Sequence, residues 1–304
     1  MILTPHLLDV DASTATLDDM DMMNTGIFNL GFIALRTGEV TTKMLQWWNI
    51  RLFEYCYIDY NNGLFTDQKW ANFMPTYFDR NEVLIFDNPG MNVAPWNLGE
   101  RELSLSDGEY YINYRQKKEG LFPLIFVHYS GFDYEKLILG DIDHKTIRGL
   151  KIYDDIVPLL NEYKTSLKDS DFTKYLKMQY TYSFFENSSQ ILGIHRRLYR
   201  RLVDDNNSFN EPFKTTAGTF FDLLKNKKMV LPTLQGVTKS NRFNTPNIEG
   251  KIKRINILLK FIYKIIGYQR YFMLIKLMRE YSKVENHVHL IQDSYLTNNI
   301  FPEK

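Results

Sequence analysis

The sequence has almost no cysteine, and this shortage narrows the classes of protein to which it can belong. Cys56 is the one cysteine in 304 residues, so the chain cannot form an intramolecular disulfide. Such usage is typical of a reducing compartment. Cys56 ends a stretch of apolar residues with helical spacing, so we expect a buried, unreactive thiol there.

Long apolar runs are also missing. No uninterrupted apolar segment approaches the ~18–20 residues that a membrane-spanning helix needs, and the N-terminal "MILTPHLLDV" lacks the basic start of a signal peptide. The net charge is only +1, which gives no overall attraction to nucleic acid or to membranes. We therefore expect a cytoplasmic protein without a nucleic-acid partner, either free or peripheral at the inner membrane face.

The sequence divides into two halves that differ in their pattern of apolar residues and turn signals. Residues 1–150 hold all four tryptophans and many glycine-containing turn signals. Three short apolar runs in this half predict buried strands: 29–35, 82–86 and 121–129. Because a helical pattern separates the first two runs, we expect an α/β layer structure.

Two finer predictions follow for residues 1–150. The stretch 41–56 has apolar residues at helical spacing, with Thr41 or Thr42 available to cap a helix. The stretch "LSLSDGEYYINYR" (103–115) predicts a hairpin that turns at Asp107 and Gly108.

Residues 151–304 are predicted to be mainly helical, because long stretches with helical spacing replace the strand signals. Residues 251–283 carry nine Lys and Arg side chains against a single acid, Glu280, with apolar residues between them and Gly267 as a break. Such a basic amphipathic helix either lies on an anionic bilayer or packs on its own domain with its basic face in water.

Polar residues that could form a site gather in the first half. Acid, amide and base follow one another in "GLFTDQKW" (63–70), and an amide precedes glycine in "NLG" (29–31). "GMNVAPWNLGER" (90–101) adds two amides, a tryptophan and an expected ion pair of Glu100 with Arg101. "FVHYSGFD" (126–133) ends a strand with a histidine and a small-residue turn. Each has an ordinary structural explanation, but together they predict one shared cleft.

Taken in order, these segments resemble a group of bacterial glycosyltransferases. The segments are "LTPHLLD", "GIFNLGFIALR", "WW", "GLFTDQKW", "DNPGMNVAPWNLGER" and "FVHYSGFD". The group is distantly similar to the retaining GT-A-type enzymes of the glycogenin and lipopolysaccharide galactosyltransferase kind. The resemblance covers residues 2–135 and continues weakly through 191–201 and 211–224. It implies a partial GT-A-type mixed sheet with flanking helices, made by residues 1–150 and followed by the helical region 151–304.

The resemblance also implies roles for residues. Asp67 and Gln68 would lie beside the anomeric carbon of a donor sugar, where a carboxylate or amide oxygen stabilises an oxocarbenium-like transition state. His128 would complete a Mn²⁺ or Mg²⁺ site. The implied substrate-binding residues are Asn29, Gly31, Lys69, Trp96, Asn97, Arg101, Ser130 and Gly131. The reaction would transfer sugar from a nucleotide-sugar donor to a glycan or lipid-linked acceptor in surface polysaccharide synthesis.

The sequence departs from the group in one respect. The usual N-terminal nucleotide-binding half, with its metal-holding DxD motif, has no counterpart in the resemblance, and "DVD" (9–11) and "DID" (141–143) are weak substitutes. We therefore expect weak or no activity for the isolated chain, with Mn²⁺ or Mg²⁺ as cofactor if it is active and no cofactor if it is inactive. Three alternatives stay open. A partner chain or a homodimer covers the exposed sheet, the chain is a non-catalytic sugar-binding or membrane-assembly module, or it is a fragment of a broken reading frame.

Overall fold

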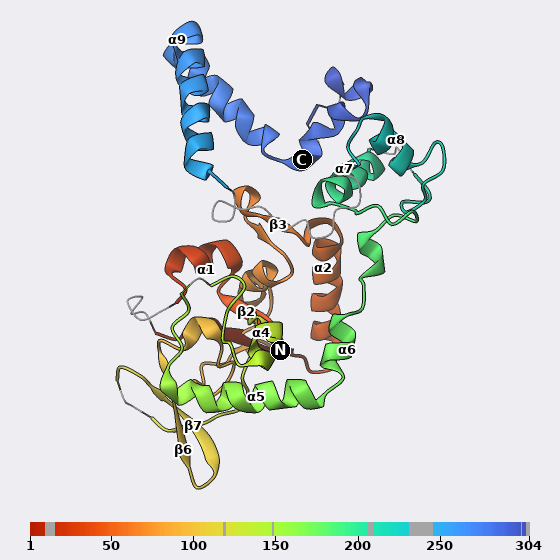
Figure 1. Cartoon of the computed structure of the whole chain (residues 1–304). Coiled ribbons are helices and arrows are strands. Elements are labelled where there is room, and N and C mark those ends of the chain that lie inside the picture. The colour runs from red at the N-terminus through yellow and green to blue at the C-terminus, as the bar shows by residue number, and fades with distance from the viewer. Residues whose placement is uncertain are drawn as a thin grey trace. The chain divides into compact units, whose positions relative to one another are not determined.

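The computed structural model describes residues 1–9, 16–117, 120–147, 149–205, 209–230, 246–298 and 300–301 (Figure 1). Contacts divide the chain into two compact units, which we call unit 1 (Met1–Lys177) and unit 2 (Met178–Lys304). The fold is mixed α/β with small sheets and many helices, which agrees with the expected class at this coarse level.

Unit 1 contains all the strands of the described residues and six of their α-helices. The strands are β1 (Ile2–Pro5), β2 (Phe28–Ala34), β3 (Ile58–Asp59), β4 (Leu64–Phe65), β5 (Leu84–Ile85), β6 (Arg101–Ser106), β7 (Glu109–Tyr114) and β8 (Phe122–Pro123). The α-helices are α1 (Asp19–Thr25), α2 (Glu39–Tyr55), α3 (Met74–Tyr77), α4 (Tyr134–Leu139), α5 (Val157–Asp169) and α6 (Phe172–Leu176). Short 3-10 helices include η3 (Gln68–Phe73), η4 (Pro95–Asn97) and η5 (Asp154–Ile156).

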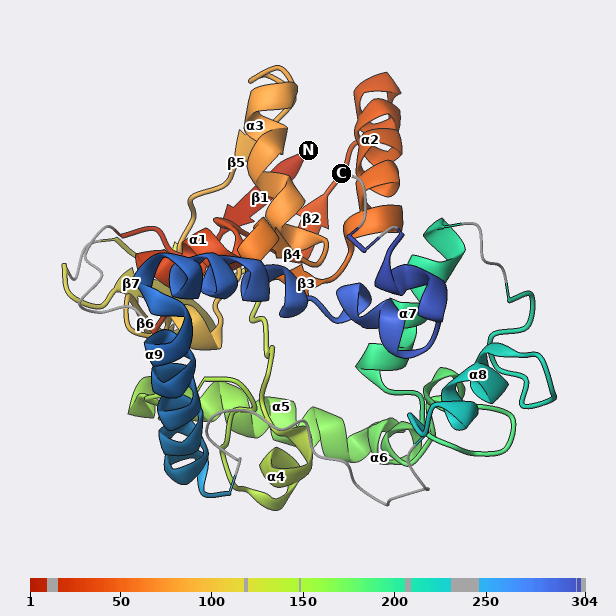
Figure 2. The same cartoon turned by 90° about the horizontal axis from the view of Figure 1, so that it is seen from above.

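The strands of unit 1 form three small sheets. The first has the order β2-β1-β5, with β1 antiparallel to β2 and parallel to β5. Side chains from β1, β2, α2, η3 and α3 meet in one core that includes Leu3, Phe28, Met44 and Met74, and Figure 2 shows α2 and α3 beside these strands. Leu84 and Ile85 on the edge strand β5 are exposed. That a partner chain or second copy covers this edge stays a prediction.

The hairpin prediction is confirmed. β6 and β7 pair antiparallel in full register, and β8 adds a third strand. Asp107 and Gly108 connect β6 to β7 with φ values of 51° and 82°. Two successive positive φ values match the right-handed twist of a hairpin, and aspartate followed by glycine adopts them readily.

Unit 1 extends past residue 150 because α5 packs into its second core. That core joins Leu103 and Ile112 of the hairpin to Leu159 and Leu160 of α5. Polar contacts reinforce it: the Asp155 carboxylate accepts a hydrogen bond from the backbone of Leu103 at 2.7 Å and pairs with Arg115 at 2.8 Å.

Two local predictions around α2 are wrong in detail. The helix begins at Glu39 and its N-cap is Gly38, so neither Thr41 nor Thr42 caps it. Their hydroxyl groups donate to backbone carbonyls instead. Cys56 follows the last turn of α2 and is exposed, not buried. The apolar residues just before Cys56, Phe53 and Tyr55, are exposed too, and Met44 is the one residue of α2 that is buried.

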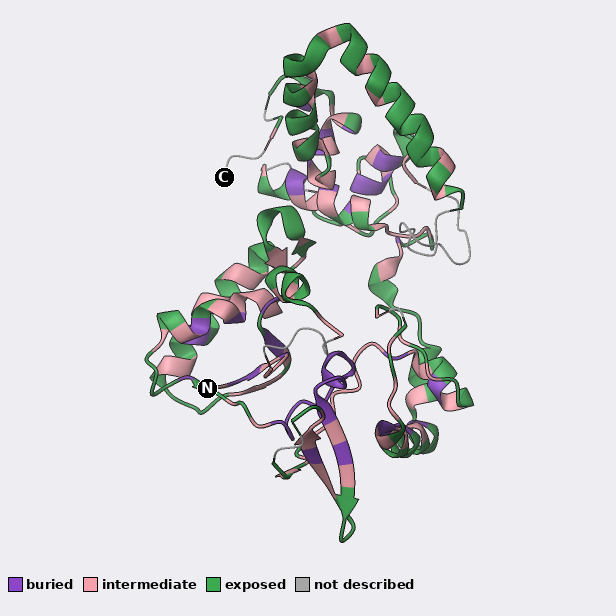
Figure 3. Cartoon of the chain, turned by 90° about the vertical axis from the view of Figure 1, so that its left-hand side faces the viewer, coloured by how far each residue is buried: buried purple, intermediate pink, exposed green. Residues whose placement is uncertain are grey.

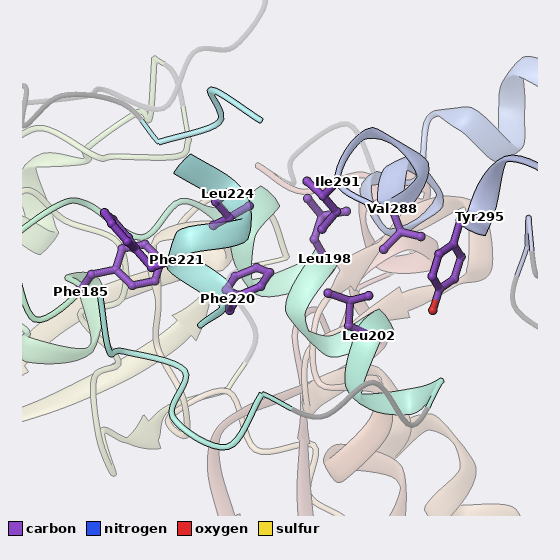
Figure 4. Close-up of a cluster of buried hydrophobic side chains, with 9 residues drawn as sticks. All are labelled: Phe185, Leu198, Leu202, Phe220, Phe221, Leu224, Val288, Ile291 and Tyr295. Carbon is purple, nitrogen blue, oxygen red and sulfur yellow. The ribbon is translucent and has the colours of Figure 1, made fainter. Parts of the chain in front are cut away.

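Unit 2 is helical in the residues that the structure describes, as predicted. Its α-helices are α7 (Gly193–Asp204), α8 (Phe220–Asn226) and α9 (Ile248–Tyr281), and its 3-10 helices are η6 (Thr181–Ser183), η7 (Val284–Leu290) and η8 (Asp293–Leu296). Leu198 and Leu202 of α7, Leu224 of α8 and Ile291 after η7 form its core (Figure 4). The proline- and glycine-containing stretch 230–250 predicts a loop, and most of it, residues 231–245, lies outside the described residues.

α9 lies apart from this core. None of its residues is buried, and Figure 3 shows exposed surface along both of its halves. Gly267 interrupts the helix with φ 78° and ψ 171°, so the predicted break is confirmed and α9 is two helical segments joined by a kink. Within the described residues, no helix is long and apolar enough to cross a membrane.

Candidate functional site

A chain of amide and imidazole side chains links β2, η3 and the strand-like segment before α4. The Oδ1 atom of Asn29 lies 3.1 Å from Nδ1 of His128, and its Nδ2 atom lies 3.3 Å from Oε1 of Gln68. Gln68 also accepts from the backbone of Leu30 at 3.3 Å and donates to the carbonyl of Thr25 at 3.1 Å. Residues far apart in sequence, and predicted from sequence to share a cleft, are therefore joined by hydrogen bonds. We call this set the amide network.

The direction of each hydrogen bond in the amide network is fixed by the backbone. Oδ1 of Asn29 accepts from the N–H of Gly31 at 3.1 Å, so the amide cannot be flipped. Nδ1 of His128 must then carry the proton that it shares with Oδ1 of Asn29 and, at 3.2 Å, with Oδ1 of Asn92. The Nε2 atom of His128 is left as a hydrogen-bond acceptor.

Gly31 brings the backbone of β2 against the ring of His128. A Cβ atom at position 31 would fall on the imidazole, with Cε1 as the nearest atom. Only glycine allows this approach. Asn29 is buried, whereas His128 is half-buried and Gly31 is exposed, so the amide network runs from the interior of unit 1 to its surface.

Two aromatic contacts frame the amide network. The ring of Trp96, in η4, meets the rings of His128 and His6 edge to face, with centroid separations of 5.3 and 5.4 Å. Asn97 holds this segment in place, because its side chain accepts from the backbone of Ala94 at 2.8 Å and donates to the carbonyl of His6 at 3.2 Å. Trp96 is therefore packed rigidly beside the network.

His6 is a member of the network that the sequence prediction missed. Its Nδ1 atom lies 3.1 Å from the carbonyl of Ile27, and its Nε2 atom lies 3.4 Å from Nδ2 of Asn29. Burial lowers its pKa to about 4, so His6 is neutral at neutral pH. The one signal in the sequence was a histidine directly after an apolar strand, "ILTPH", which is too common a pattern to single out.

Burial also lowers the pKa of His128, which favours the neutral form of its ring. A doubly protonated ring would keep its bonds to the two amide oxygens but would lose the acceptor at Nε2. The network is thus a set of neutral donors and acceptors with no charge of its own. Neutral amides, imidazoles and an aromatic ring are groups that recognise sugar hydroxyls by hydrogen bonding and stacking.

Two buried donors at this place have no partner among the residues that the structure describes. They are Nδ2 of Asn92 and Nε1 of Trp96, and the two residues are 0% and 7% exposed. Asn92 also has a φ of 59°, in the left-handed region that non-glycine residues seldom adopt. Because an unpaired buried donor costs about 1–3 kcal/mol, both are candidates for donating to a ligand oxygen.

A buried ion pair supports the segment behind the network. Nε of Arg101 lies 3.3 Å from the Glu100 carboxylate, which confirms the predicted pair, and the two residues are 1% and 4% exposed. Arg101 also donates to the carbonyl of Met91 at 2.8 Å, and Glu100 accepts from the backbones of Leu8 and Asp9. Burial raises the pKa of Glu100 and lowers that of Arg101. Arg101 thereby holds the backbone beside Asn92 and does not reach the surface.

Asp67 and Gln68, the adjacent acid and amide of "GLFTDQKW", contact different parts of unit 1. Gln68 joins the amide network, whereas Asp67 faces the end of α2. Burial and then the negative charge of Asp67 raise the pKa of Cys56. The backbone carbonyl of Asp67 accepts from Nε1 of Trp48 at 3.2 Å. Hydrogen bonds thus join Gln68 to the amide network and the backbone of Asp67 to α2.

Three other predicted residues also lie outside the network. Nζ of Lys69 donates to the carbonyls of Met23 and Asn24, at the C-terminal end of α1. Gly131 has a φ of 75°, and a Cβ atom there would come within 2.5 Å of the His144 ring. Nε2 of His144 in turn lies 3.0 Å from the carbonyl of Ser130. Ser130 and Gly131 thus form a turn packed against the following segment.

The donor set around His128 does not fit the Mn²⁺ or Mg²⁺ that the resemblance implies. These ions prefer several oxygen ligands, carboxylates above all. In the described part of the chain, no group of three or more His, Cys, Asp or Glu side chains is placed to hold a metal ion. Asp9 pairs with Lys117 and Asp143 with Lys136, while Asp11 lies outside the described residues.

Comparison with known proteins places the chain near one relative without assigning a function. The chain is similar to the "Uncharacterized protein YfnF" of Bacillus subtilis, with 29% identity over 164 residues, or 51% of this chain and 50% of the relative. The chain thus spans about half the length of the curated relative it matches. No protein-family model matches the chain, and no solved structure matches it.

Proposed function

We propose that this chain is a glycosyltransferase-like protein in which unit 1 is part of a GT-A-type domain. In this proposal, the amide network receives the sugar of a nucleotide-sugar donor, and the sugar is transferred to a glycan or lipid-linked acceptor in surface polysaccharide synthesis. The observation that carries the proposal is the joining of Asn29, Gln68 and His128 beside Trp96. These residues come from separate segments, and the resemblance to glycosyltransferases rests on the same segments.

The polarity of the network suits sugar recognition. Nδ2 of Asn92 and Nε1 of Trp96 are unpaired donors, and Nε2 of His128 is an acceptor on a half-buried ring. A sugar hydroxyl both donates and accepts, so it can complete such a set. Asp67 would supply the carboxylate beside the anomeric centre. That role requires the Asp67 carboxylate to lie beside Gln68 when the donor binds.

The first experiment is calorimetric titration of the purified chain with UDP, UDP-glucose and UDP-galactose, with and without Mn²⁺. We expect a UDP-sugar to bind more tightly than UDP, because the network contacts the sugar. Replacing Asn29 by alanine removes contacts to His128 and Gln68, so sugar-dependent affinity should fall about ten-fold or more. Asn81→Ala is the matched control, since it deletes an exposed amide elsewhere in unit 1.

Two results would decide against the proposal. If the folded chain binds neither UDP nor any UDP-sugar, there is no donor site in this chain. If Asn29→Ala and Asn81→Ala bind equally well, the amide network is a structural element of unit 1 and not a sugar site.

A non-catalytic sugar-binding module is the second candidate function. It is favoured by the donor set, since the described residues hold no cluster that fits a metal ion. In that case free sugars or oligosaccharides should bind as well as UDP-sugars do, without Mn²⁺, and no transfer of labelled sugar to an acceptor should occur. Asn29→Ala should weaken this binding too.

A further inference from the structure

α9 presents an unusually apolar surface to solvent. Thirteen of its large apolar side chains are exposed, with exposed fractions from 36% to 70%. They are Ile252, Ile255, Ile257, Leu258, Phe261, Tyr263, Ile265, Tyr268, Phe272, Met273, Ile275, Leu277 and Met278. Single exposed apolar residues are ordinary, but a continuous apolar surface on one element marks a place where something binds.

The charged side chains of α9 are almost all basic. Lys and Arg occupy eight of its positions, and its two acids are Glu249 and Glu280. No more than five consecutive residues of α9 lack a charge. Cations therefore recur along the whole apolar element, and they do not gather at one end.

The first segment of α9 carries a row of lysines opposite a row of apolar residues. Lys253, Lys260 and Lys264 are seven and four residues apart, so they share one side of the helix. Ile255, Leu259, Ile262 and Ile266 recur every three or four residues and share the opposite side, where Ile255 is exposed and the other three are half-buried. The segment thus has a row of lysines opposite a row of apolar residues, while Lys251 lies on the apolar side and Arg254 and Phe261 lie between the two rows.

A kink at Gly267 joins the two segments of α9. The rings of Tyr263 and Tyr271 meet across it edge to face, with centroids 5.6 Å apart. The φ of 78° at this position is one that glycine adopts without strain. The kink divides α9 into two short segments, each of which carries its own apolar and basic residues.

We propose that α9 binds the surface of an anionic lipid bilayer, with its apolar side chains among the acyl chains and its lysines and arginines at the lipid headgroups. Charge selects this occupant over a second copy of the chain. Two copies of α9 packed together would bring two strongly positive helices into contact, whereas anionic headgroups neutralise them. Long lysine side chains can also extend from a partly inserted helix to the headgroups.

The test is sedimentation of the full chain with vesicles. Vesicles of phosphatidylcholine mixed with phosphatidylglycerol should carry the protein down at low salt and release it at high salt. Vesicles of phosphatidylcholine alone should not. Each lysine near an anionic surface raises the binding constant roughly five-fold. Replacing Lys253, Lys260 and Lys264 together by glutamine should therefore weaken vesicle binding roughly a hundred-fold.

The control replaces three exposed lysines outside α9, Lys43, Lys168 and Lys225, by glutamine. It changes the net charge equally and should bind as the unchanged chain does. A second variant, Phe261→Ser with Ile265→Ser, tests the apolar contribution and should also bind more weakly. No residue of α9 is buried, so the lysine variant of α9 and the Phe261→Ser, Ile265→Ser variant should both keep the helical circular dichroism of the unchanged chain.

Three results would overturn the proposal. They are absence of sedimentation at any salt concentration, equal sedimentation with uncharged vesicles, and equal loss of binding in the α9 and control lysine variants. A dimer that Phe261→Ser with Ile265→Ser dissociates, without vesicle binding, would assign the surface to a second copy instead. Vesicle binding is measured without any sugar nucleotide, so it stands or falls independently of the proposed sugar site.

Discussion

Units 1 and 2 differ in their buried polar residues and in how their exposed apolar residues are distributed. Seven buried polar residues lie in unit 1, in the part that the structure describes: Thr4, His6, Asn29, Asn92, Asn97, Glu100 and Arg101. Unit 2 has three, His195, Arg201 and Asn286. Both units expose large apolar side chains, but in unit 2 most of them lie on one helix, α9, which has no buried residue.

This difference bears on function because each placement has a cost in free energy. Buried polar groups cost stability unless they are hydrogen-bonded, and exposed apolar surface costs stability unless it is covered. In unit 1 most of these groups form a connected set around Asn29, with two donors left unpaired. These placements are the basis for proposing a polar ligand for unit 1 and an anionic lipid surface for α9.

The most damaging change in unit 1 should be Arg101→Met. The substitution leaves the Glu100 carboxylate buried without its ion-pair partner and frees the carbonyl of Met91. Breaking a buried pair from one side costs about 3–5 kcal/mol. All four tryptophans lie in unit 1, so urea unfolding followed by tryptophan fluorescence reports on this unit.

Glu100→Gln combined with Arg101→Met should recover part of that loss, because no buried charge then remains. Equal losses in the single and double variants would mean that the ion pair itself is not the source of the effect.

Unit 2 offers a direct comparison of its core with α9. Leu198 is 0% exposed and Leu258 is 56% exposed. Leu198→Ala should lower the free energy of unfolding by about 2–5 kcal/mol, because it opens a cavity in the core. Leu258→Ala should change it by less than about 0.5 kcal/mol. Thermal unfolding followed by far-ultraviolet circular dichroism measures both. Equal losses would show that α9 is covered in solution.

Acid should destabilise unit 1 through His6. Burial lowers the pKa of His6 from 6.5 to about 4, so the unfolded chain binds the proton more readily than the folded chain does between these values. The folded state therefore has its full stability above pH 6.5. As the pH falls toward 4, protonation of His6 lowers the free energy of unfolding by about 3 kcal/mol. Protonation would also set an N–H of His6 against the Nδ2 donor of Asn29.

The measurement is urea unfolding at several pH values, followed by tryptophan fluorescence. His6→Gln keeps a polar side chain but cannot take up this proton, so its stability should fall less steeply over the same range. An unchanged slope in His6→Gln would place the acid sensitivity at other groups.

The sequence predicted those structural features that are determined by residues close together in the chain. The turn at Asp107 and Gly108, the strand at 28–34 and the break at Gly267 were predictable because short-range backbone preferences decide them. The start of α2 was not, because two threonines that could cap it lie inside the helix.

The site divides in the same way. Residue types indicated that Asn29, Gln68, Trp96 and His128 belong together, and the structure brings them together. The sequence did not show which of two adjacent polar residues would contact the network. Gln68 and Lys69 are neighbours in sequence, yet the turn of η3 directs one side chain to the network and the other to α1. His6 depends on long-range pairing of β1 with β2, which no local pattern records.

The smallest predicted effect concerns Lys69. Its ammonium group donates to the last carbonyls of α1, at the negative end of the helix dipole. A cation in that position stabilises a helix by about 0.3–1 kcal/mol, so Lys69→Met should lower the stability of unit 1 by no more than that amount. Fluorescence-detected urea unfolding at low and high salt measures it, because salt screens an exposed charge and should narrow the difference. A loss several times larger, unaffected by salt, would mean that the stem of Lys69 holds η3 against α1 by packing, and that the two neighbours Gln68 and Lys69 support the amide network together.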